Sequence, residues 1–295
     1  MNNFMCPLCG LTEGKPSWLA LDFLDRRFDY MECRGCESLI CWPMPDDTIL
    51  AKMYDSSYCE TAEAFGEDAS LAKFSEVIEF IRSLPNGNFI DYGCGDGKLL
   101  VKVKSLGWDV AGIDFNPDFA DLAKQQGIGV TSPDQATDVL ADVLHLGDVI
   151  EHLTDLNAQF PEILKRIKPG GLLIAHGPLE ANANLFYRVI KFNKNLRGRK
   201  ATNIPPFHVI LATSKGQLRL FERFDLKEIK FSVQEVAFPA LDKLSTKDFY
   251  NPRQVSLYAL RKVSQLVSSL NMRDSGNRYF YVGQKPLTAQ ANGRN

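Results

Sequence analysis

Short apolar runs alternate with amphipathic segments between residues 85 and 180, and this alternation predicts the fold class. The apolar runs have strand length and lie at 89–91, 109–114, 128–131, 142–146 and 172–175. Helical patterns separate them at 98–106, 116–127 and 155–168. In the last of these, apolar residues recur on one face at Leu156, Phe160, Ile163 and Ile167. Strands that alternate with helices predict an α/β protein with a parallel sheet covered on both faces.

Glycine and proline mark where the predicted elements end. A helix over 70–84 stops at Pro85-Asn86-Gly87-Asn88, and Gly107 caps the helix over 98–106. Asn116-Pro117 is a good start for the helix that runs to Gly127. Pro169-Gly170-Gly171 ends the helix over 155–168, and Pro161 either kinks that helix or marks its true start.

The last third of the chain breaks this rhythm. Residues 180–212 fit neither pattern and are expected to be an insertion. After it, the sequence predicts a helix at 214–223, a strand at 226–233 and a long helix at 252–270. A last strand at 278–282 lies close enough to the strand before it to pair antiparallel, and the tail after Pro286 is polar.

Composition excludes several classes of protein. Of 295 residues, 45% are apolar, and 19 Phe, 9 Tyr and 3 Trp are too many for a disordered chain. Lys and Arg number 34 against 36 Asp and Glu, a net charge of −2 that argues against a mainly nucleic-acid-coating role. The chain has no apolar run long enough to span a membrane, and its start lacks the features of a secretory signal. A soluble, cytoplasmic protein is expected.

The spacing of four cysteines predicts a metal site. Cys6 and Cys9 form one C-x-x-C pair, and Cys33 and Cys36 form a second. Two such pairs can place four thiolates around one Zn²⁺, and a closed shell of four sulfurs makes this zinc structural. An odd total of seven cysteines argues against a disulfide framework. The prediction is a zinc ribbon over 1–45 followed by one domain over 46–295, with Cys41 and Cys59 as thiols outside the site.

A glycine-rich turn follows the first strand of the α/β pattern. It reads Asp91-Tyr92-Gly93-Cys94-Gly95-Asp96-Gly97, and Asp114 ends the next strand. Glycines let backbone approach a ligand closely, and an acid at this place can bind the hydroxyls of a ribose. The plain alternative is a tight turn and a surface aspartate. A dinucleotide fingerprint would need glycine where Lys98 stands, which makes a nicotinamide oxidoreductase the weakest reading.

The D-x-G-x-G-x-G turn resembles motif I of class I S-adenosylmethionine-dependent methyltransferases. The segments VAGIDFNPDFADLAKQQG, ADVLHLGDVIEHLTD and LKRIKPGGLLIAHGP resemble the later motifs of that family, in order, over residues 85–180. The resemblance implies a Rossmann-like seven-stranded sheet with an antiparallel last strand. It also implies cofactor roles, which fall to Asp91, Gly93 and Gly95 for the methionine and ribose, Asp114 for the ribose hydroxyls, Phe115 for the adenine and Asp148 for the sulfonium side.

The cysteine module narrows the resemblance. A four-cysteine module, then Pro43-Met44-Pro45 with Tyr54 and Tyr58, then this fold resembles bacterial zinc-containing methyltransferases that act on sugars. The segment PPFHVILATSKGQLRLFERFDL resembles the part of those enzymes that follows the fifth strand. The resemblance implies a small hydroxylated acceptor, such as a sugar, a nucleotide-sugar or a residue of a surface glycan.

Four histidines are candidates for acid–base chemistry at the acceptor. His208 in the insertion is the first choice as general base, with a structural loop histidine as the alternative. His152 beside Glu151 either helps to bind a divalent ion or, as we favour, orients a helix. His145 is expected in the core, and His176 ends the fifth predicted strand, where it either faces the site or does not.

Two further readings concern charge. The insertion carries six cationic residues, which form either a solvated basic face, as we favour, or a binding site for a diphosphate. They are Arg188, Lys191, Lys194, Arg197, Arg199 and Lys200. An RNA methyltransferase with the ribbon as an RNA clamp is an alternative function, but residues 1–45 hold four cations against six acids. A non-catalytic module that binds S-adenosylmethionine is a third possibility.

Overall fold

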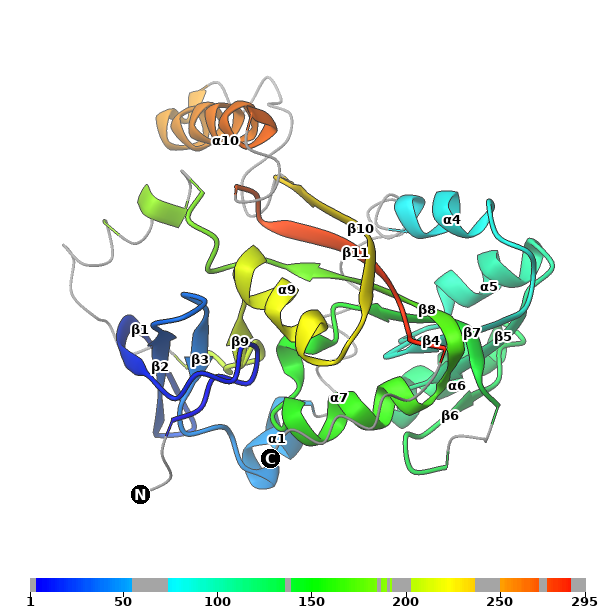
Figure 1. Cartoon of the computed structure of the whole chain (residues 1–295). Coiled ribbons are helices and arrows are strands. Elements are labelled where there is room, and N and C mark those ends of the chain that lie inside the picture. The colour runs from blue at the N-terminus through cyan, green and yellow to red at the C-terminus, as the bar shows by residue number, and fades with distance from the viewer. Residues whose placement is uncertain are drawn as a thin grey trace. The chain divides into compact units, whose positions relative to one another are not determined.

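The computed structural model describes residues 4–54, 74–135, 139–184, 187–189, 192, 203–236, 250–270 and 275–287 (Figure 1). Its contacts divide the chain into two compact units. The cysteine unit comprises 1–44, 177–220 and 231–279, and the glycine-turn unit comprises 45–176, 221–230 and 280–295. Among the described residues, no helix is both long enough and apolar enough to cross a membrane.

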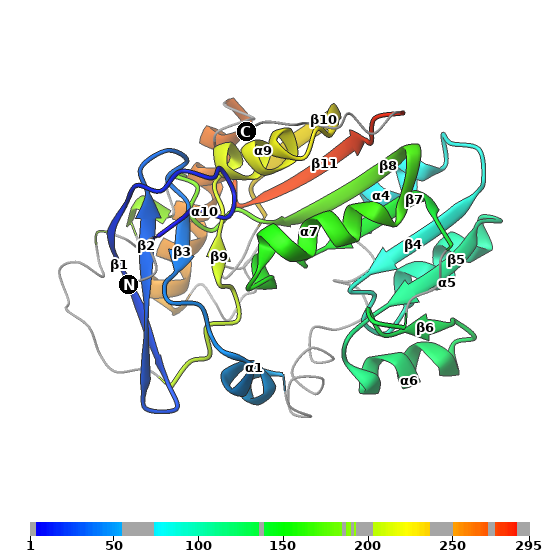
Figure 2. The same ribbon diagram turned by 60° about the horizontal axis from the view of Figure 1, so that its bottom comes forward.

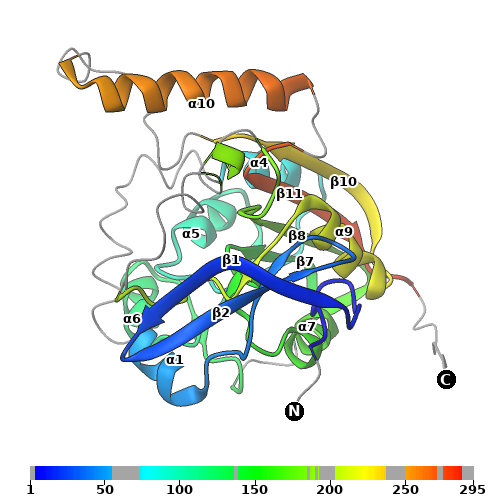
Figure 3. The same cartoon turned by 90° about the vertical axis from the view of Figure 1, so that its left-hand side faces the viewer.

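The cysteine unit contains a small antiparallel sheet in the order β1-β2-β3-β9. Its strands are β1 (Gly14–Phe23), β2 (Arg26–Cys33), β3 (Leu39–Cys41) and β9 (Ile210–Leu211). Leu24 and Asp25, both at positive φ, join β1 to β2 in a two-residue hairpin (Figure 3). Since β9 comes from the predicted insertion, the sheet joins two segments that are far apart in the sequence (Figure 2).

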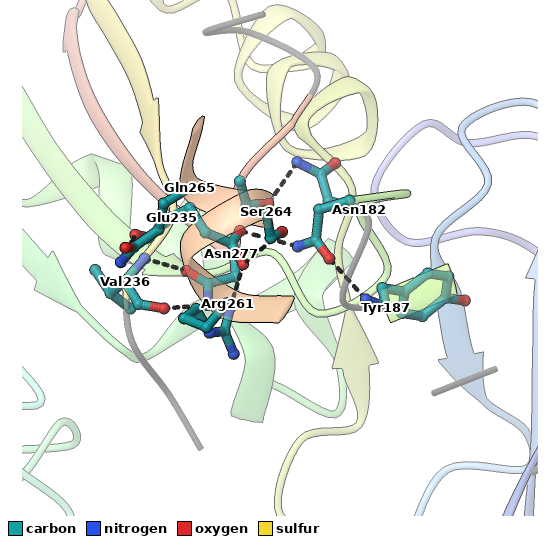
Figure 4. A network of polar contacts seen from close by, with 10 residues as sticks. Asn182, Tyr187, Glu235, Val236, Arg261, Ser264, Gln265 and Asn277 are labelled. Atoms are coloured by element: carbon teal, nitrogen blue, oxygen red, sulfur yellow. Dashed lines mark hydrogen bonds and ion pairs between the residues drawn. The ribbon is translucent and has the colours of Figure 1, made fainter. Parts of the chain in front are cut away.

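A network of polar contacts anchors helix α10 (Pro252–Leu270) in the cysteine unit. Arg261 and Glu235 form a fully buried ion pair, and Ser264 donates a hydrogen bond to the same carboxylate (Figure 4). The side chain of Asn277 both accepts from the N–H of Val236 and donates to its carbonyl, at 2.8 and 2.9 Å. The face that α10 buries is therefore polar, which its sequence pattern alone does not indicate.

The second sheet has seven strands in the order β10-β11-β8-β7-β4-β5-β6, and its last strand along the chain, β11, is antiparallel. The strands are β4 (Asn88–Tyr92), β5 (Asp109–Ile113), β6 (Val130–Thr131), β7 (Ala141–Gly147), β8 (Ile167–Pro178), β10 (Lys227–Gln234) and β11 (Arg278–Gln284). The neighbours of β4, namely β5 and β7, run parallel to it. This topology confirms the predicted α/β fold class, including the antiparallel last strand.

Helices cover both faces of the sheet in the glycine-turn unit. α4 (Ser75–Ile81), α5 (Lys98–Ser105) and α6 (Pro117–Gln125) contribute to one apolar core with strand residues such as Phe89 and Phe280. On β11 the neighbouring Tyr281 points the other way and stacks on Phe221, with ring centroids 3.8 Å apart. Phe160 of α7 (Leu156–Lys165) lies beside Phe221 on that second face. Shorter helices in the described part of the chain include α1 (Asp47–Met53), η1 (Ile150–His152) and α9 (Ser214–Arg223).

One predicted helix end is wrong. α7 stops at Lys165, so Ile167 is the first residue of β8 and Pro169-Gly170-Gly171 lies inside that strand. Ala141 pairs with Ile167 and Val143 with Leu172, so β8 carries extra residues there as a bulge. Backbone bonds between Gly170, Gly171 and Lys285 hold the bulge against the chain after β11. Pro161 lies within α7 rather than at its start.

Candidate functional site

The glycine-rich turn joins β4 to α5 and folds back onto the end of β5. The N–H groups of Gly93 and Cys94 both donate to the carbonyl of Ile113, at 2.7 and 3.2 Å. Gly93 has φ +78°, and a Cβ there would lie 2.5 Å from a methyl carbon of Val149. The turn therefore requires glycine at this position for both conformation and space.

The space beside Gly95 has a different character. Gly95 has φ +53°, yet a Cβ built there would meet no atom within 4 Å. Its N–H donates to one carboxylate oxygen of Asp114 at 2.9 Å, and the N–H of Asn116 donates to the other oxygen, also at 2.9 Å. The residues thus leave room directly beside the turn, next to an acid.

Asp114 is suited to accept hydrogen bonds from a diol. Asp114 is only 8% exposed, and burial raises the pKa of its carboxyl above the ordinary value. The two carboxylate oxygens have four lone pairs in all, and the backbone N–H groups of Gly95, Asn116 and Phe115 face them, so capacity for a further donor remains. The remaining acceptor capacity and the open space at Gly95 fit the ribose that the sequence predicts here.

An aromatic group stands next to this acid. Phe115 is 60% exposed, and its ring packs nearly perpendicular to that of Tyr54, with centroids 5.3 Å apart. The Tyr54 hydroxyl lies 3.0 Å from Nδ1 of His152. An exposed flat ring next to the acid that the sequence predicts to bind a ribose fits a planar base, and Tyr54 connects His152 to that ring. The segment Pro43-Met44-Pro45 with Tyr54 and Tyr58 resembles a family pattern, but that pattern does not indicate the contact between Tyr54 and His152. Tyr58 lies outside the described residues.

Asp91 is buried rather than open to solvent. It is 3% exposed, and its Oδ1 lies 2.7 Å from Nδ1 of His145, which is 2% exposed. The rings of His145 and His176 lie 4.9 Å apart, and a Cβ at Gly147 would clash with both. His145 is thus a core residue, as the sequence predicts, and it pairs with the acid of the glycine turn. Sequence reasoning missed this partnership because it joins β4 to β7.

Asp148 follows β7 in a strained conformation. It has φ +53° although it is not a glycine, and its N–H donates to the carbonyl of His176 at 2.9 Å. Such a conformation persists only where surrounding bonds hold it, and it occurs often at functional sites. This position at the carboxyl end of a parallel strand, beside β4, is where ligands bind in open α/β sheets.

The four predicted metal ligands come together in the cysteine unit. The sulfurs of Cys6, Cys9, Cys33 and Cys36 all lie within 4.8 Å of one another, a set that could hold a metal ion. Cys6 and Cys36 are 3.6 Å apart and Cys9 and Cys33 are 3.5 Å apart, Sγ to Sγ. The hydrogen bond from Cys6 lowers the pKa of Cys36, which favours its thiolate form. Cys41 is buried outside this set, and Cys59 lies outside the described residues.

The candidate base His208 has a carboxylate partner. Its Nδ1 lies 2.7 Å from Oε2 of Glu180, and both side chains are about one-third exposed. Sequence reasoning missed Glu180, which is 28 positions away at the start of the predicted insertion. Of the six cations in that insertion, Arg188 donates to the carbonyl of Ala183, and the other five lie outside the described residues.

The sheet and the glycine turn have the arrangement expected of an S-adenosylmethionine-dependent methyltransferase, and the family match shows that class. Residues 65–213, just over half of the chain, match the methyltransferase-domain family, and the chain belongs to that family. It is 25% identical over 238 residues to the ubiquinone biosynthesis O-methyltransferase of Brucella melitensis biotype 2, a match that covers 77% of this chain and 84% of the relative. A shorter match, 35% identical over 112 residues, is to the ribosomal protein L11 methyltransferase of Photobacterium profundum and covers 35% of this chain and 37% of that one.

Solved structures share the fold at low sequence identity. The magnesium protoporphyrin IX methyltransferase of Synechocystis PCC 6803 has a TM-score of 0.53 at 13% identity, covering 81% of this chain and 100% of that one. The [4+2]-cyclase SpnF has a TM-score of 0.52 at 15% identity, covering 83% of this chain and 99% of that one. Because a cyclase shares the fold, the fold by itself does not identify the reaction.

Proposed function

We propose that this methyltransferase transfers a methyl group from S-adenosylmethionine to a hydroxyl of a small acceptor, with a sugar as the acceptor class. The observation that carries the proposal is the His208–Glu180 pair, which provides a base for a hydroxyl of high pKa. Oxygen as the acceptor atom is also supported by the O-methyltransferase that matches 77% of the chain. Sugar as the class rests on the resemblance of the cysteine module and the segment around His208 to sugar methyltransferases.

The cofactor roles that we propose follow the geometry of the glycine turn. Gly95 provides the space beside the turn, Asp114 accepts from the ribose hydroxyls and Phe115 packs on the adenine. Asp91, Gly93 and Asp148 are assigned to the methionine and sulfonium side by the same resemblance. When bound, S-adenosylmethionine supplies an electrophilic methyl group on a sulfonium sulfur.

His208 is proposed to remove the proton of the acceptor hydroxyl. A hydrogen bond from Nδ1–H to the Glu180 carboxylate selects the tautomer whose basic nitrogen is Nε2. Nε2 takes the hydroxyl proton as the oxygen electron pair bonds to the methyl carbon, and the electron pair of the broken S–C bond stays on sulfur. Glu180 then stabilises the imidazolium that forms.

Zinc is the proposed occupant of the four-cysteine site. A tetrahedron with Zn–S bonds of about 2.3 Å separates its sulfurs by about 3.8 Å, close to the distances between these cysteines. Four sulfur ligands close the metal's shell, so its proposed role is structural. For His152 we propose an orienting role, because its ring nitrogen holds the Tyr54 hydroxyl.

The test is a methyl-transfer assay with isotopically labelled S-adenosylmethionine and separate pools of nucleotide sugars, glycans, phenols and RNA, read by mass spectrometry. We expect label on a sugar hydroxyl, and a loss of kcat of about 10²- to 10⁴-fold in His208→Ala with unchanged cofactor affinity. Label on RNA alone would overturn the acceptor class. Full activity in His208→Ala would overturn the assignment of the base.

A further inference from the structure

The backbone on both sides of His208 is hydrogen-bonded to the cysteine module, residues 4–44. The Tyr30 hydroxyl, on a residue that is only 1% exposed, donates to the carbonyl of His208 at 2.8 Å. The N–H of Cys41 donates to the carbonyl of the next residue, Val209, at 2.8 Å. Ile210 and Leu211 then form β9 and pair with β3 of the module. The chain from 208 to 211 therefore forms the outer edge of the module's own sheet.

A second attachment reaches the metal site itself. The Thr213 hydroxyl donates to the carbonyl of Cys36 at 2.6 Å, and the Thr213 N–H donates to the hydroxyl of Ser38 at 3.0 Å. Ser38 is fully buried, and a Cβ on Gly216 would collide with its hydroxyl and with Leu8. The position of Cys36 thus sets the position of the chain just beyond β9.

The partner of His208 is anchored to the same stretch of chain. Next to Glu180, the N–H of Ala181 donates to the carbonyl of Ala212 at 3.2 Å. The buried side chain of Asn182 accepts from the N–H of Ser214 and donates to its hydroxyl, both at 2.8 Å. His208 and Glu180 are therefore both held relative to residues 208–214, and those residues are held by the module.

We propose that the cysteine module positions the His208–Glu180 pair, with Tyr30 as the positioning residue and the bound metal acting through Cys36. This inference rests on the proposed role of His208 as base. It assigns the cysteine module a function other than binding the methyl acceptor. Rate in such a transfer depends on the alignment of base, acceptor and methyl group, and small displacements of the base are costly. Tyr30 acts only through the backbone of His208, so its loss affects turnover rather than cofactor affinity.

The test compares Tyr30→Phe with Tyr281→Phe in the full-length, metal-loaded protein. Both changes remove one hydroxyl that is buried and donates to a backbone carbonyl, but Tyr281 donates to Leu226 at 3.5 Å in the glycine-turn unit. In Tyr30→Phe we expect kcat to fall about tenfold, with unchanged KM for S-adenosylmethionine and unchanged zinc content. Amide hydrogen exchange of 207–213 should become faster in this variant and stay unchanged in Tyr281→Phe.

Removal of the metal gives an independent readout that needs no turnover. In protein stripped with a chelator, hydrogen exchange of 207–213 should rise while S-adenosylmethionine still binds by calorimetry. Unchanged kcat and unchanged exchange in Tyr30→Phe, while His208→Ala is inactive, would overturn the positioning role and leave the proposed base intact. Joint loss of kcat, cofactor binding and zinc in Tyr30→Phe would also overturn it, because that result indicates general destabilisation.

Discussion

Replacing Gly95 by alanine separates the cost of backbone strain from the cost of losing ligand space. Gly95 has φ +53°, and an alanine in this left-handed region costs about 1–2 kcal/mol. No atom lies within 4 Å of the added Cβ, so the structure without ligand adds no clash to this cost. We expect the melting temperature to fall by roughly 2–8 °C, at about 2–4 °C per kcal/mol for a protein of this size.

The effect of Gly95→Ala on cofactor affinity should be larger than its effect on stability. The Cβ would occupy the open space at the turn that we assign to the cofactor. We expect Kd for S-adenosylmethionine to rise at least about tenfold, which corresponds to about 1.4 kcal/mol. Isothermal titration calorimetry measures this Kd directly, and differential scanning calorimetry on the same samples gives the melting temperature.

Gly127→Ala is the matched control for this experiment. Gly127 follows α6 with φ +74°, and a Cβ there also meets nothing within 4 Å. The same strain without a nearby ligand should lower the melting temperature by a similar amount and leave Kd unchanged. Wild-type cofactor affinity in Gly95→Ala, or equally weakened binding in Gly127→Ala, would refute the assignment of this space to the cofactor.

Three further predictions concern the acid, the metal and the buried ion pair. Burial raises the pKa of Asp114 above the ordinary 3.8, so protonation of this carboxylate should weaken cofactor binding as the pH falls toward that raised pKa. Asp114→Asn should bind the cofactor roughly tenfold more weakly and lose this pH dependence, which calorimetry from pH 8 downward would show. Elemental analysis should find zinc in the wild type and in Cys41→Ala, which lies outside the cluster, but not in Cys9→Ser. Equal zinc in the two variants would contradict the assignment. Arg261→Met leaves Glu235 charged and buried, and it should destabilise the folded protein by about 3–5 kcal/mol. The double variant with Glu235→Leu should recover most of this loss. Chemical denaturation measures both variants, and an equally unstable double variant would contradict the prediction.

Local patterns predicted most elements because periodicity and breaker residues act over short distances. The helices at 214–223 and 252–270 have the predicted bounds, since each carries its own periodic pattern. The error at the end of α7 arose where a local signal competed with strand pairing. Pro169-Gly170-Gly171 looks like a stop between two elements, but bonds to β7 and to the chain after β11 extend β8 through it.

The candidate sites divide in the same way. The four cysteines and the Asp114–glycine turn lie in short motifs whose spacing carries the chemistry, so the sequence was enough to propose them. The partners of the histidines were not predictable, because no motif connects Glu180 to His208 or His145 to Asp91. Tyr30 meets His208 across 178 positions, and only the pairing of β3 with β9 brings them together.

The sequence by itself determined the α/β order of elements, the methyltransferase class and which four cysteines form a cluster. These properties depend on residue type at fixed local spacing, which a linear chain displays in full. Only the tertiary structure decided that β9 joins the sheet of the cysteine module, that Glu180 partners His208, and that α10 packs through a buried ion pair. Such contacts join residues that are far apart in the sequence and depend on how the sheets assemble, which a local pattern does not encode.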